Sequence, residues 1–182
     1  MSLSRTTFVC AALATSLSLA VAASPALAAL KAGDKAPDFK LATATDGKTG
    51  AFSLKDSLKK GPVVVYFYPK AFTGVCSLEA RTFADNMPKF KALNVTVIGV
   101  STDTIQKVTE FSKADCQGKF PVAADTDAKV AKAYDAKMAA VNMAARVSYL
   151  ITPDNKIYAT HEAGDGVSHP MKMLEAAQKL KK

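Results

Sequence analysis

Two continuous apolar runs constrain the fold of this chain more than any other feature. They cover residues 63–68 (VVVYFY) and 95–100 (VTVIGV) and are rich in β-branched side chains. Buried strands of a parallel sheet have this composition, because helices cover both faces of such a sheet. A helical pattern separates the two runs, and its apolar stripe consists of Cys76, Ala80, Phe83, Met87 and Phe90. We therefore predict a strand, a helix and a second strand in this order.

The rest of the chain supplies further strands and helices around this unit. Strands are expected at 39–41 and 51–53 (both short and at an edge), at 120–124, and as a hairpin at 147–151 and 157–160. Helices are expected from Ile105 to the closing Gly118, over 126–136 and over 170–180, and Pro88 should kink or split the helix that contains it. This order predicts an α/β fold of three layers, with strand additions at the N-terminal end and a closing hairpin and helix.

Residues 1–28 have the pattern of a secretory signal peptide. A short basic start with Arg5 precedes an apolar stretch, and the small residues Ala26 and Ala28 match a cleavage site. The alternative is a retained membrane anchor, but Thr and Ser interrupt the stretch, which falls short of the ~20 apolar residues of a span. We expect export to the periplasm or the cell exterior, no stable membrane contact after cleavage, and one mature domain over residues 29–182.

The positive charge of the chain does not indicate a nucleic-acid-binding protein. The formal net charge is +8, and the signal contributes only Arg5, so the mature domain keeps +7. The lysines are scattered, apart from Lys179, Lys181 and Lys182 at the end. Nucleic-acid binding usually requires a basic stripe with aromatic residues or a known motif, and neither is present. We interpret the charge as a solvated surface, with steering of an acidic protein partner as the alternative.

The mature domain contains two cysteines, Cys76 and Cys116, and two histidines. The cysteines form no Cys-x-x-Cys pair, and His161 and His169 lack the spacing of zinc ligands with either of them. We therefore expect no metal site and no bound cofactor. The histidines are expected to cap an element or to lie on the surface.

Cys76 is the candidate nucleophile. It follows the strand 63–68 as the third residue of the predicted helix, with Thr73 at the N-cap position. Unpaired N–H groups and the positive end of the helix dipole favour a thiolate, which is the reactive form of cysteine. The alternative is a small buried hydrophobic residue, as free cysteines often are. The hydroxyl of Thr73 and the rigid Pro69 favour the first interpretation.

The pattern Pro69-x-x-x-Thr73-x-x-Cys76 resembles the signature of the peroxiredoxins, the thiol peroxidases of the AhpC/TSA superfamily. The resemblance covers nearly the whole mature domain and includes residues 33–39 (GDKAPDF), 98–103 (IGVSTD), 120–125 (FPVAAD) and 146–154 (RVSYLITPD). It is nearest to the bacterioferritin-comigratory, or peroxiredoxin Q, branch. It implies a thioredoxin-like fold and the thiol-dependent reduction of hydrogen peroxide or organic hydroperoxides.

By this resemblance, Cys76 is the peroxidatic cysteine, which attacks the peroxide and becomes a sulfenic acid. Arg146 matches the active-site arginine, whose permanent charge would stabilise the thiolate; alone, it would be read as a charge at a strand edge. Pro69 would shield the sulfur, and Thr73 would hydrogen-bond to the sulfur and the peroxide. Glu79 matches an acidic residue of this branch, and we expect a solvated charge or a local hydrogen-bond acceptor rather than a proton donor.

The recycling step is where this sequence departs from some relatives. One subtype carries its resolving cysteine five residues after the first, where this chain has Arg81. Cys116 remains, and we expect it in the last turn of a helix, at the edge of the apolar face. Because helix ends fray easily, we predict that Cys116 resolves Cys76 as a disulfide after local unfolding. The alternative is an inert Cys116 in a one-cysteine enzyme that uses an external thiol.

The resemblance also implies partners. Electrons would come from a thioredoxin-like protein or a small thiol, and the protein would be a monomer or a homodimer. Two other functions stay open. A thiol–disulfide oxidoreductase would use the same fold, although the missing Cys-x-x-Cys counts against it, and a non-enzymatic redox sensor would use the oxidation of Cys76 to signal through a partner.

Overall fold

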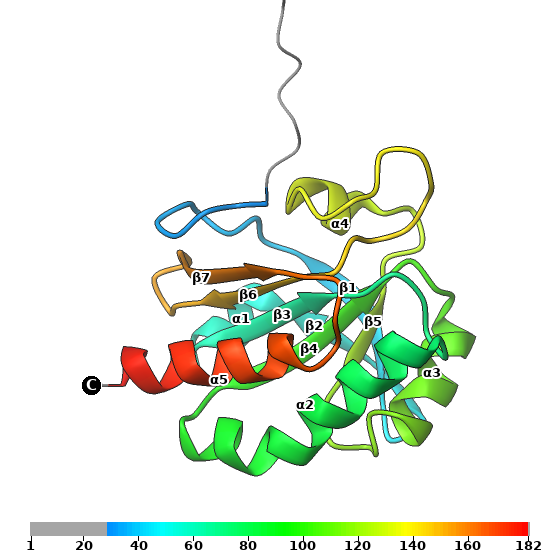
Figure 1. The fold of residues 1–182 in the computed structure, drawn as a ribbon, viewed down its shortest axis with the longest axis horizontal. Coiled ribbons are helices and arrows are strands. Elements are labelled where there is room, and N and C mark those ends of the chain that lie inside the picture. Colours follow the sequence, from blue (N-terminus) through cyan, green and yellow to red (C-terminus); the bar gives the residue numbers. More distant parts are fainter. Residues whose placement is uncertain (1–28, 182) are drawn as a thin grey trace, which may run out of the picture.

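The computed structural model describes residues 29–181, so the predicted signal peptide lies outside the described residues. In this part of the chain, seven strands form one sheet in the order β2-β1-β5-β4-β3-β6-β7, and five helices pack against it (Figure 1). The strands are β1 (Lys40–Thr45), β2 (Lys48–Ser53), β3 (Val63–Phe67), β4 (Thr96–Ser101), β5 (Val122–Ala124), β6 (Val147–Ile151) and β7 (Ile157–Glu162). The helices are α1 (Leu54–Leu58), α2 (Gly74–Ala92), α3 (Ile105–Ala114), α4 (Lys129–Ala133) and α5 (Ser168–Leu180).

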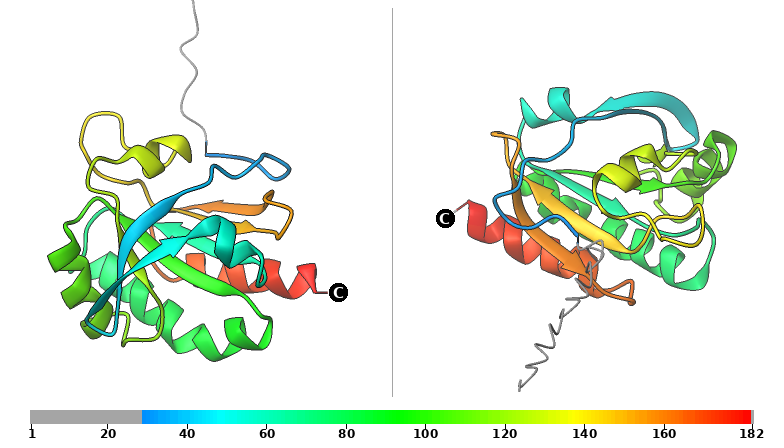
Figure 2. Two further views of the ribbon diagram at one scale, coloured as in Figure 1. Left: turned by 180° about the vertical axis from the view of Figure 1, so that it is seen from behind. Right: turned by 90° about the horizontal axis from the view of Figure 1, so that it is seen from above.

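The central strand β3 is buried on both faces. Val64 and Tyr66 belong to a core shared with α2, α3 and α5, whereas Val65 and Phe67 belong to a core shared with α1 and α4. This alternation follows from the two-residue period of a strand. In the left view of Figure 2, α4 lies above the strands and α2 lies below them. The prediction of a three-layer α/β sandwich is therefore confirmed.

The pairing of β3 determines which parts of the chain meet at its carboxyl end. β3 runs parallel to β4, with Phe67 opposite Val100, and antiparallel to β6, with Phe67 opposite Val147. The start of β6 therefore lies beside the end of β3, where α2 follows. Arg146, which immediately precedes β6, reaches the start of α2 because of this register.

The edge of the sheet is longer than the sequence predicted. Strands β1 and β2 form a hairpin around Asp46 and Gly47, which both have positive φ angles, 50° and 71°. The strand expected at 120–124 is shorter, because pairing begins only at Val122, after Pro121, which has no backbone N–H to donate.

The helix expected over residues 126–136 was predicted too long, since α4 spans only Lys129–Ala133. Ala128 adopts a left-handed conformation (φ 54°) directly before it, and Asp135 (φ 51°) does so after it. The carboxylate of Asp125 accepts hydrogen bonds from the backbone N–H groups of Val130 and Ala131, at 3.2 and 2.8 Å. These contacts position a short helix instead of a long one.

Helix α2 is not split at Pro88, which was one of the two outcomes expected there, and it continues to Ala92. Pro88 lies in the last turns, where the loss of one backbone hydrogen bond affects little of the helix. Met87 and Phe90, on either side of it, are buried in the core and keep this end of the helix on the sheet. Within residues 29–181, no helix is both long and apolar enough to span a membrane.

Candidate active site

Cys76 lies at the start of α2, where the sequence placed it. It is the third residue of the helix, after the N-cap Thr73 and Gly74, and its side chain is buried (2% exposed) in the core beneath α2. Both Cys76 and Cys116 are free thiols. The sulfur therefore lies near the positive end of a 19-residue helix, which stabilises a negative charge.

Thr73 is the N-cap residue in backbone conformation (φ −89°, ψ 149°), as predicted, but its side chain does not cap the helix. The hydroxyl instead donates a 3.0 Å hydrogen bond to the carbonyl oxygen of Lys70 and so closes the turn before the helix. Pro69 immediately precedes this turn, half-buried, two residues beyond the end of β3. The direct hydrogen bond from Thr73 to sulfur that the resemblance implied is thus replaced by a turn-closing bond.

The loop between β3 and α2 contains a strained residue that the sequence did not indicate. Phe72 has a φ of 65°, which is unusual for a bulky side chain. Its exposed ring packs edge-on against Phe111 of α3, with 5.3 Å between the ring centroids. The preceding residue, Ala71, donates its backbone N–H to Asp103 at 2.7 Å. Such strain is found at functional sites, where the surrounding contacts compensate for it.

Arg146 contacts the candidate nucleophile, as predicted. Its Nη2 donates to the Sγ atom of Cys76 at 3.1 Å, across 70 residues of sequence. The guanidinium is nearly buried, and its Nη1 donates to the carboxylate of Glu79. Because Arg cannot lose its proton in a protein, the sulfur has a permanent cation beside it.

Glu79 is not a solvated charge, contrary to one of the two expectations; it is completely buried and acts as a hydrogen-bond acceptor for Arg146. Burial raises the pKa of its carboxyl to about 8, although the Arg146 guanidinium acts in the opposite direction. The helical spacing contained a signal for this position. Glu79 follows Cys76 by three residues and therefore lies on the same face of α2.

His169 is also buried, at the start of α5, so a surface position was the wrong expectation for it. Its Nδ1 lies 2.9 Å from the hydroxyl oxygen of Ser148 on β6, and its Nε2 lies 3.1 Å from the carbonyl oxygen of Ala163. Burial lowers the pKa of this imidazole to about 4, so the ring is neutral at pH 7. Nothing in the sequence indicated this burial, because polar residues are common where a helix begins.

Cys116 lies two residues beyond the end of α3, not in its last turn, and it is completely buried rather than at the edge of the apolar face. It belongs to the same core cluster as Cys76. Burial, together with the neighbouring carboxylate of Asp115, raises the pKa of the Cys116 thiol well above its usual range. In the folded state, Cys116 is therefore unreactive.

A family model described as the AhpC/TSA family matches residues 32–160. The chain belongs to the AhpC/TSA family. Among curated relatives, the putative peroxiredoxin YkuU of Bacillus subtilis is 32% identical over 158 residues, which are 80% of this chain and 88% of that protein. The putative peroxiredoxin bcp of Helicobacter pylori is 42% identical over 107 residues, which are 59% of this chain and 67% of that protein.

Solved structures of peroxiredoxins share the fold. The peroxidoxin BcpB from Mycobacterium tuberculosis matches with a TM-score of 0.76 and 27% identity, over 84% of this chain and 99% of that chain. A cysteine-to-serine mutant of Xylella fastidiosa PrxQ matches with a TM-score of 0.75 and 26% identity, over 85% of this chain and 99% of that chain. The family and the thioredoxin-like fold that the sequence predicted are therefore confirmed, and the chain is a thiol-dependent peroxidase.

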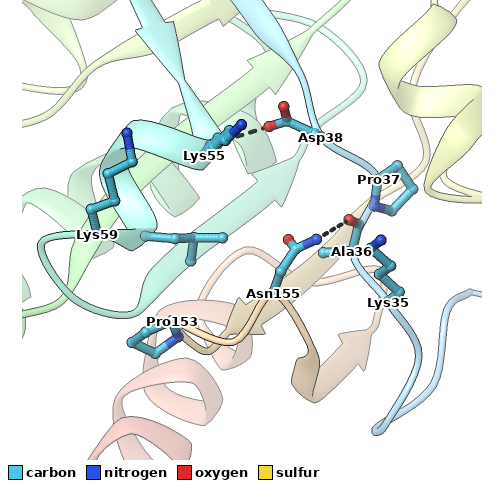
Figure 3. A pocket seen from close by; sticks show the side chains of 9 residues that line it. Lys35, Ala36, Pro37, Asp38, Lys55, Lys59, Pro153 and Asn155 are labelled. Atoms are coloured by element: carbon cyan, nitrogen blue, oxygen red, sulfur yellow. Dashed lines mark hydrogen bonds between the residues drawn. The ribbon is translucent and has the colours of Figure 1, made fainter.

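A separate hollow of about 660 Å³ lies between α1, the N-terminal segment and the β6–β7 turn (Figure 3). Its walls are formed by Lys35, Ala36, Pro37, Asp38, Lys55, Leu58, Lys59, Pro153 and Asn155. Two hydrogen bonds join neighbouring residues of these walls, from the Lys55 backbone to Asp38 and from the Asn155 amide to Ala36. None of the predicted site residues lines this hollow, which lies at the opposite end of β3 from Cys76.

Proposed function

We propose that this peroxidase reduces hydrogen peroxide or organic hydroperoxides through the thiolate of Cys76. The observation that carries the proposal is the 3.1 Å contact between Nη2 of Arg146 and Sγ of Cys76 at the start of α2. The thiolate attacks the terminal oxygen of the peroxide, and the O–O bond breaks. That oxygen and its proton stay on the sulfur as sulfenic acid, while the departing oxide takes a proton from the medium and leaves as water or an alcohol.

Two features of the site support the chemistry of this step. The guanidinium of Arg146 and the helix start both stabilise negative charge, first on the sulfur and then on the departing oxygen. Pro69, at the start of the β3–α2 loop, would shield the sulfur from water. Thr73, whose hydroxyl closes the turn before the helix by donating to Lys70, would accept a hydrogen bond from the bound peroxide.

Cys116 would resolve the sulfenic acid. Its thiol would attack the Cys76 sulfur, release water and form a disulfide, which a thioredoxin-like protein or a small thiol would then reduce. A disulfide requires Cα atoms within about 7 Å. Since Cys116 is completely buried, the reaction requires local opening of the segment after α3. The signal peptide pattern supports the additional proposal that these steps occur in the periplasm or outside the cell. The assembly that we propose is a monomer or a homodimer, as the family resemblance implies.

The one-cysteine mechanism is the second candidate, and one observation favours it. Cys116 is completely buried in the folded state, so an external thiol that reaches Cys76 first would reduce the sulfenic acid directly. A thiol–disulfide oxidoreductase or a redox sensor are further alternatives. Insulin reduction without peroxide consumption would support the former, and slow oxidation without turnover would support the latter.

Stopped-flow peroxide consumption by the mature protein tests the proposal, with Cys76→Ser and Cys116→Ser variants compared in parallel. We expect no fast reaction in Cys76→Ser, and one fast turnover without disulfide formation in Cys116→Ser. Peptide mapping of the peroxide-treated wild type should find a Cys76–Cys116 bridge. A Cys76→Ser variant that still consumes peroxide rapidly would disprove the role of Cys76, and the absence of the bridge would leave the one-cysteine mechanism.

A further inference from the structure

A buried polar chain continues beyond Arg146, away from the sulfur. One carboxylate oxygen of Glu79, Oε2, accepts from Arg146, but the other, Oε1, has no hydrogen-bond partner among residues 29–181, although it is completely buried. A buried acceptor without a partner is costly, and such groups are rare in folded proteins. An explanation for this oxygen must therefore come from the group that faces it.

The group that faces Oε1 is the imidazole of His169, whose Nδ1 lies 3.7 Å away. Its Nε2 lies 3.1 Å from the carbonyl oxygen of Ala163, which can only accept, so Nε2 carries the proton of the neutral ring. Nδ1 is then an acceptor as well. The hydroxyl of Ser148 lies 2.9 Å from Nδ1. Because a hydroxyl can both donate and accept, this contact is compatible with either protonation state of Nδ1. An ionised Glu79 would therefore place two acceptors, Oε1 and Nδ1, opposite each other inside the core, and a proton on the carboxyl removes this conflict.

We propose that His169 is a positioning residue: it faces a protonated Glu79 carboxyl at neutral pH and thereby sets how much of the Arg146 charge acts on the nucleophilic sulfur. This inference rests on the proposed role of Cys76. When the Glu79 carboxyl is neutral, the guanidinium balances only the thiolate. When the carboxyl is ionised, the guanidinium is shared between two anions and stabilises the thiolate less.

The pKa values of the two groups agree with this geometry. Burial raises the pKa of Glu79 to about 8, so the carboxyl is mostly protonated at pH 7. Burial lowers the pKa of His169 to about 4, so the ring remains an acceptor at that pH. Between about pH 4 and pH 8 the pair therefore holds one proton in addition to the Nε2–H of the neutral ring, and this proton is on the carboxyl.

The other charged and titratable groups around the Glu79–His169 pair come from the loop before α5, from β7 and from β3. Asp165, before α5, raises the pKa of both Glu79 and His169, but hydrogen bonds from Ser168 lower its own pKa to about 2, so its charge is constant. His161 on β7 packs edge-on against His169, with 4.7 Å between the ring centroids. Tyr66 on β3 stays neutral, because burial raises its pKa well above its usual range.

Infrared spectroscopy of the intact protein tests where the proton lies. We expect the C=O stretch of a buried carboxylic acid at pH 7, which disappears as the pH is raised through about 8 and is absent from a Glu79→Gln variant. A spectrum without this band, or a band that Glu79→Gln leaves unchanged, would overturn the proposal. This readout does not depend on peroxide turnover, so it is separate from the test of Cys76.

A His169→Asn variant tests the coupling to the sulfur. The amide N–H of Asn, near the position of Nδ1, would donate to Oε1 and favour the ionised carboxyl. We expect the infrared band to be lost at pH 7 and the peroxide rate constant at pH 6 to fall by about tenfold, with a matching loss of thiolate absorbance. The inflection near pH 8 in the rate profile should also disappear.

Two further variants separate this role from a purely structural one. In a Glu79→Gln background the carboxyl cannot ionise, so the added His169→Asn change should have no further effect on the pH profile. His161→Asn replaces the neighbouring histidine and should retain the inflection near pH 8. An additive loss in the double variant, or an unchanged profile in His169→Asn, would show that His169 only fills space.

Discussion

The hydroxyl of Ser77 donates a 2.7 Å hydrogen bond to the carboxylate of Asp115, so the residue after Cys76 is tied to the residue before Cys116. Arg81, one turn further along α2, donates to the same carboxylate through Nε at 2.9 Å and Nη2 at 2.6 Å. The Asp115 side chain is only 4% exposed. Hydrogen bonds to a buried charge are among the stronger ones in proteins, so these contacts keep both cysteine segments closed.

The first prediction concerns the hydrogen bonds from Ser77 and Arg81 to Asp115. Asp115→Asn removes the charge and weakens three hydrogen bonds, which should reduce the free energy of local closure by about 1–2 kcal/mol. Cys116 should then be exposed about ten times more often, and a thiol reagent should label it about tenfold faster in a Cys76→Ser background. Mass spectrometry of quenched samples measures this rate. In an Asp115→Asn variant that retains Cys76, disulfide formation after peroxide treatment should accelerate by a similar factor.

A matched control uses the exposed carboxylate of Asp127, which pairs with the exposed Lys129. Asp127→Asn should leave the labelling of Cys116 unchanged within about twofold, because exposed ion pairs contribute little to stability. Equal labelling rates in the two variants would mean that Asp115 does not control the opening of this segment.

The second prediction concerns the cation beside the sulfur. Arg146→Lys keeps the charge but replaces a planar fork, which reaches both Cys76 and Glu79, with a point charge. We expect the second-order rate constant for peroxide to fall by about 100-fold, the usual cost of one lost donor to a developing anion. Stopped-flow measurement under pseudo-first-order conditions determines it. Lys129→Arg, at an exposed position of α4, is the control and should stay within about twofold of the wild type.

The sequence was informative where the pattern is local. The position of Cys76 followed from a buried strand, an N-cap residue and a helical stripe, all within residues 63–90. The contact between Arg146 and Cys76, which are 70 residues apart, was available only through the family resemblance, because it depends on which distant strand pairs with β3. The register that creates the contact is a property of the whole sheet.

The buried polar residues could not be predicted in this way. A Glu or a His is usually exposed, and only the packing of α5 against α2 and β6 encloses Glu79 and His169. Cys116 was misplaced for a related reason. The segment after α3 folds back into the core, with the backbone N–H of Cys116 donating to the carbonyl oxygen of Phe111 at 3.2 Å. Local patterns describe a helix, but they do not show what the chain does after the helix ends.

The third prediction concerns Gly166, which precedes α5 and lies against the active-site helix. A Cβ atom added at this position would lie 2.5 Å from the carbonyl oxygen of Val75 and 3.0 Å from the backbone nitrogen of Glu79. Gly166→Ala should therefore push α5 away from α2 and lower the free energy of unfolding by about 2–3 kcal/mol. Gly164→Ala is the matched control, since no heavy atom of the described chain lies within 4 Å of its added Cβ. Urea denaturation of both variants should show a clear loss only in Gly166→Ala, and equal midpoints would contradict the prediction.

The fourth prediction concerns the pH dependence of stability, because the pKa values of Glu79 and His169 are shifted in opposite directions. The pKa of Glu79 is raised in the folded state to about 8 from an ordinary 4.5, so the folded protein binds this proton more tightly and loses stability as the pH rises from about 4.5 to 8. The pKa of His169 is lowered to about 4 from 6.5, so the folded protein loses stability as the pH falls from about 6.5 to 4. Between pH 4.5 and 6.5 the two contributions oppose each other and largely cancel.

Removing one member of the pair should therefore reveal the other. In the wild type, the free energy of unfolding should be nearly constant from pH 4.5 to 6.5 and should fall by about 2 kcal/mol from pH 6.5 to 8. In Glu79→Gln the loss above pH 6.5 should vanish, whereas a loss of about 3 kcal/mol should appear as the pH falls from 6.5 to 4, because His169 now titrates without compensation. Urea denaturation at half-unit pH intervals measures both curves. Parallel curves for the two proteins would mean that Glu79 is ionised in the folded state throughout this range, and that the buried pair holds no proton at neutral pH.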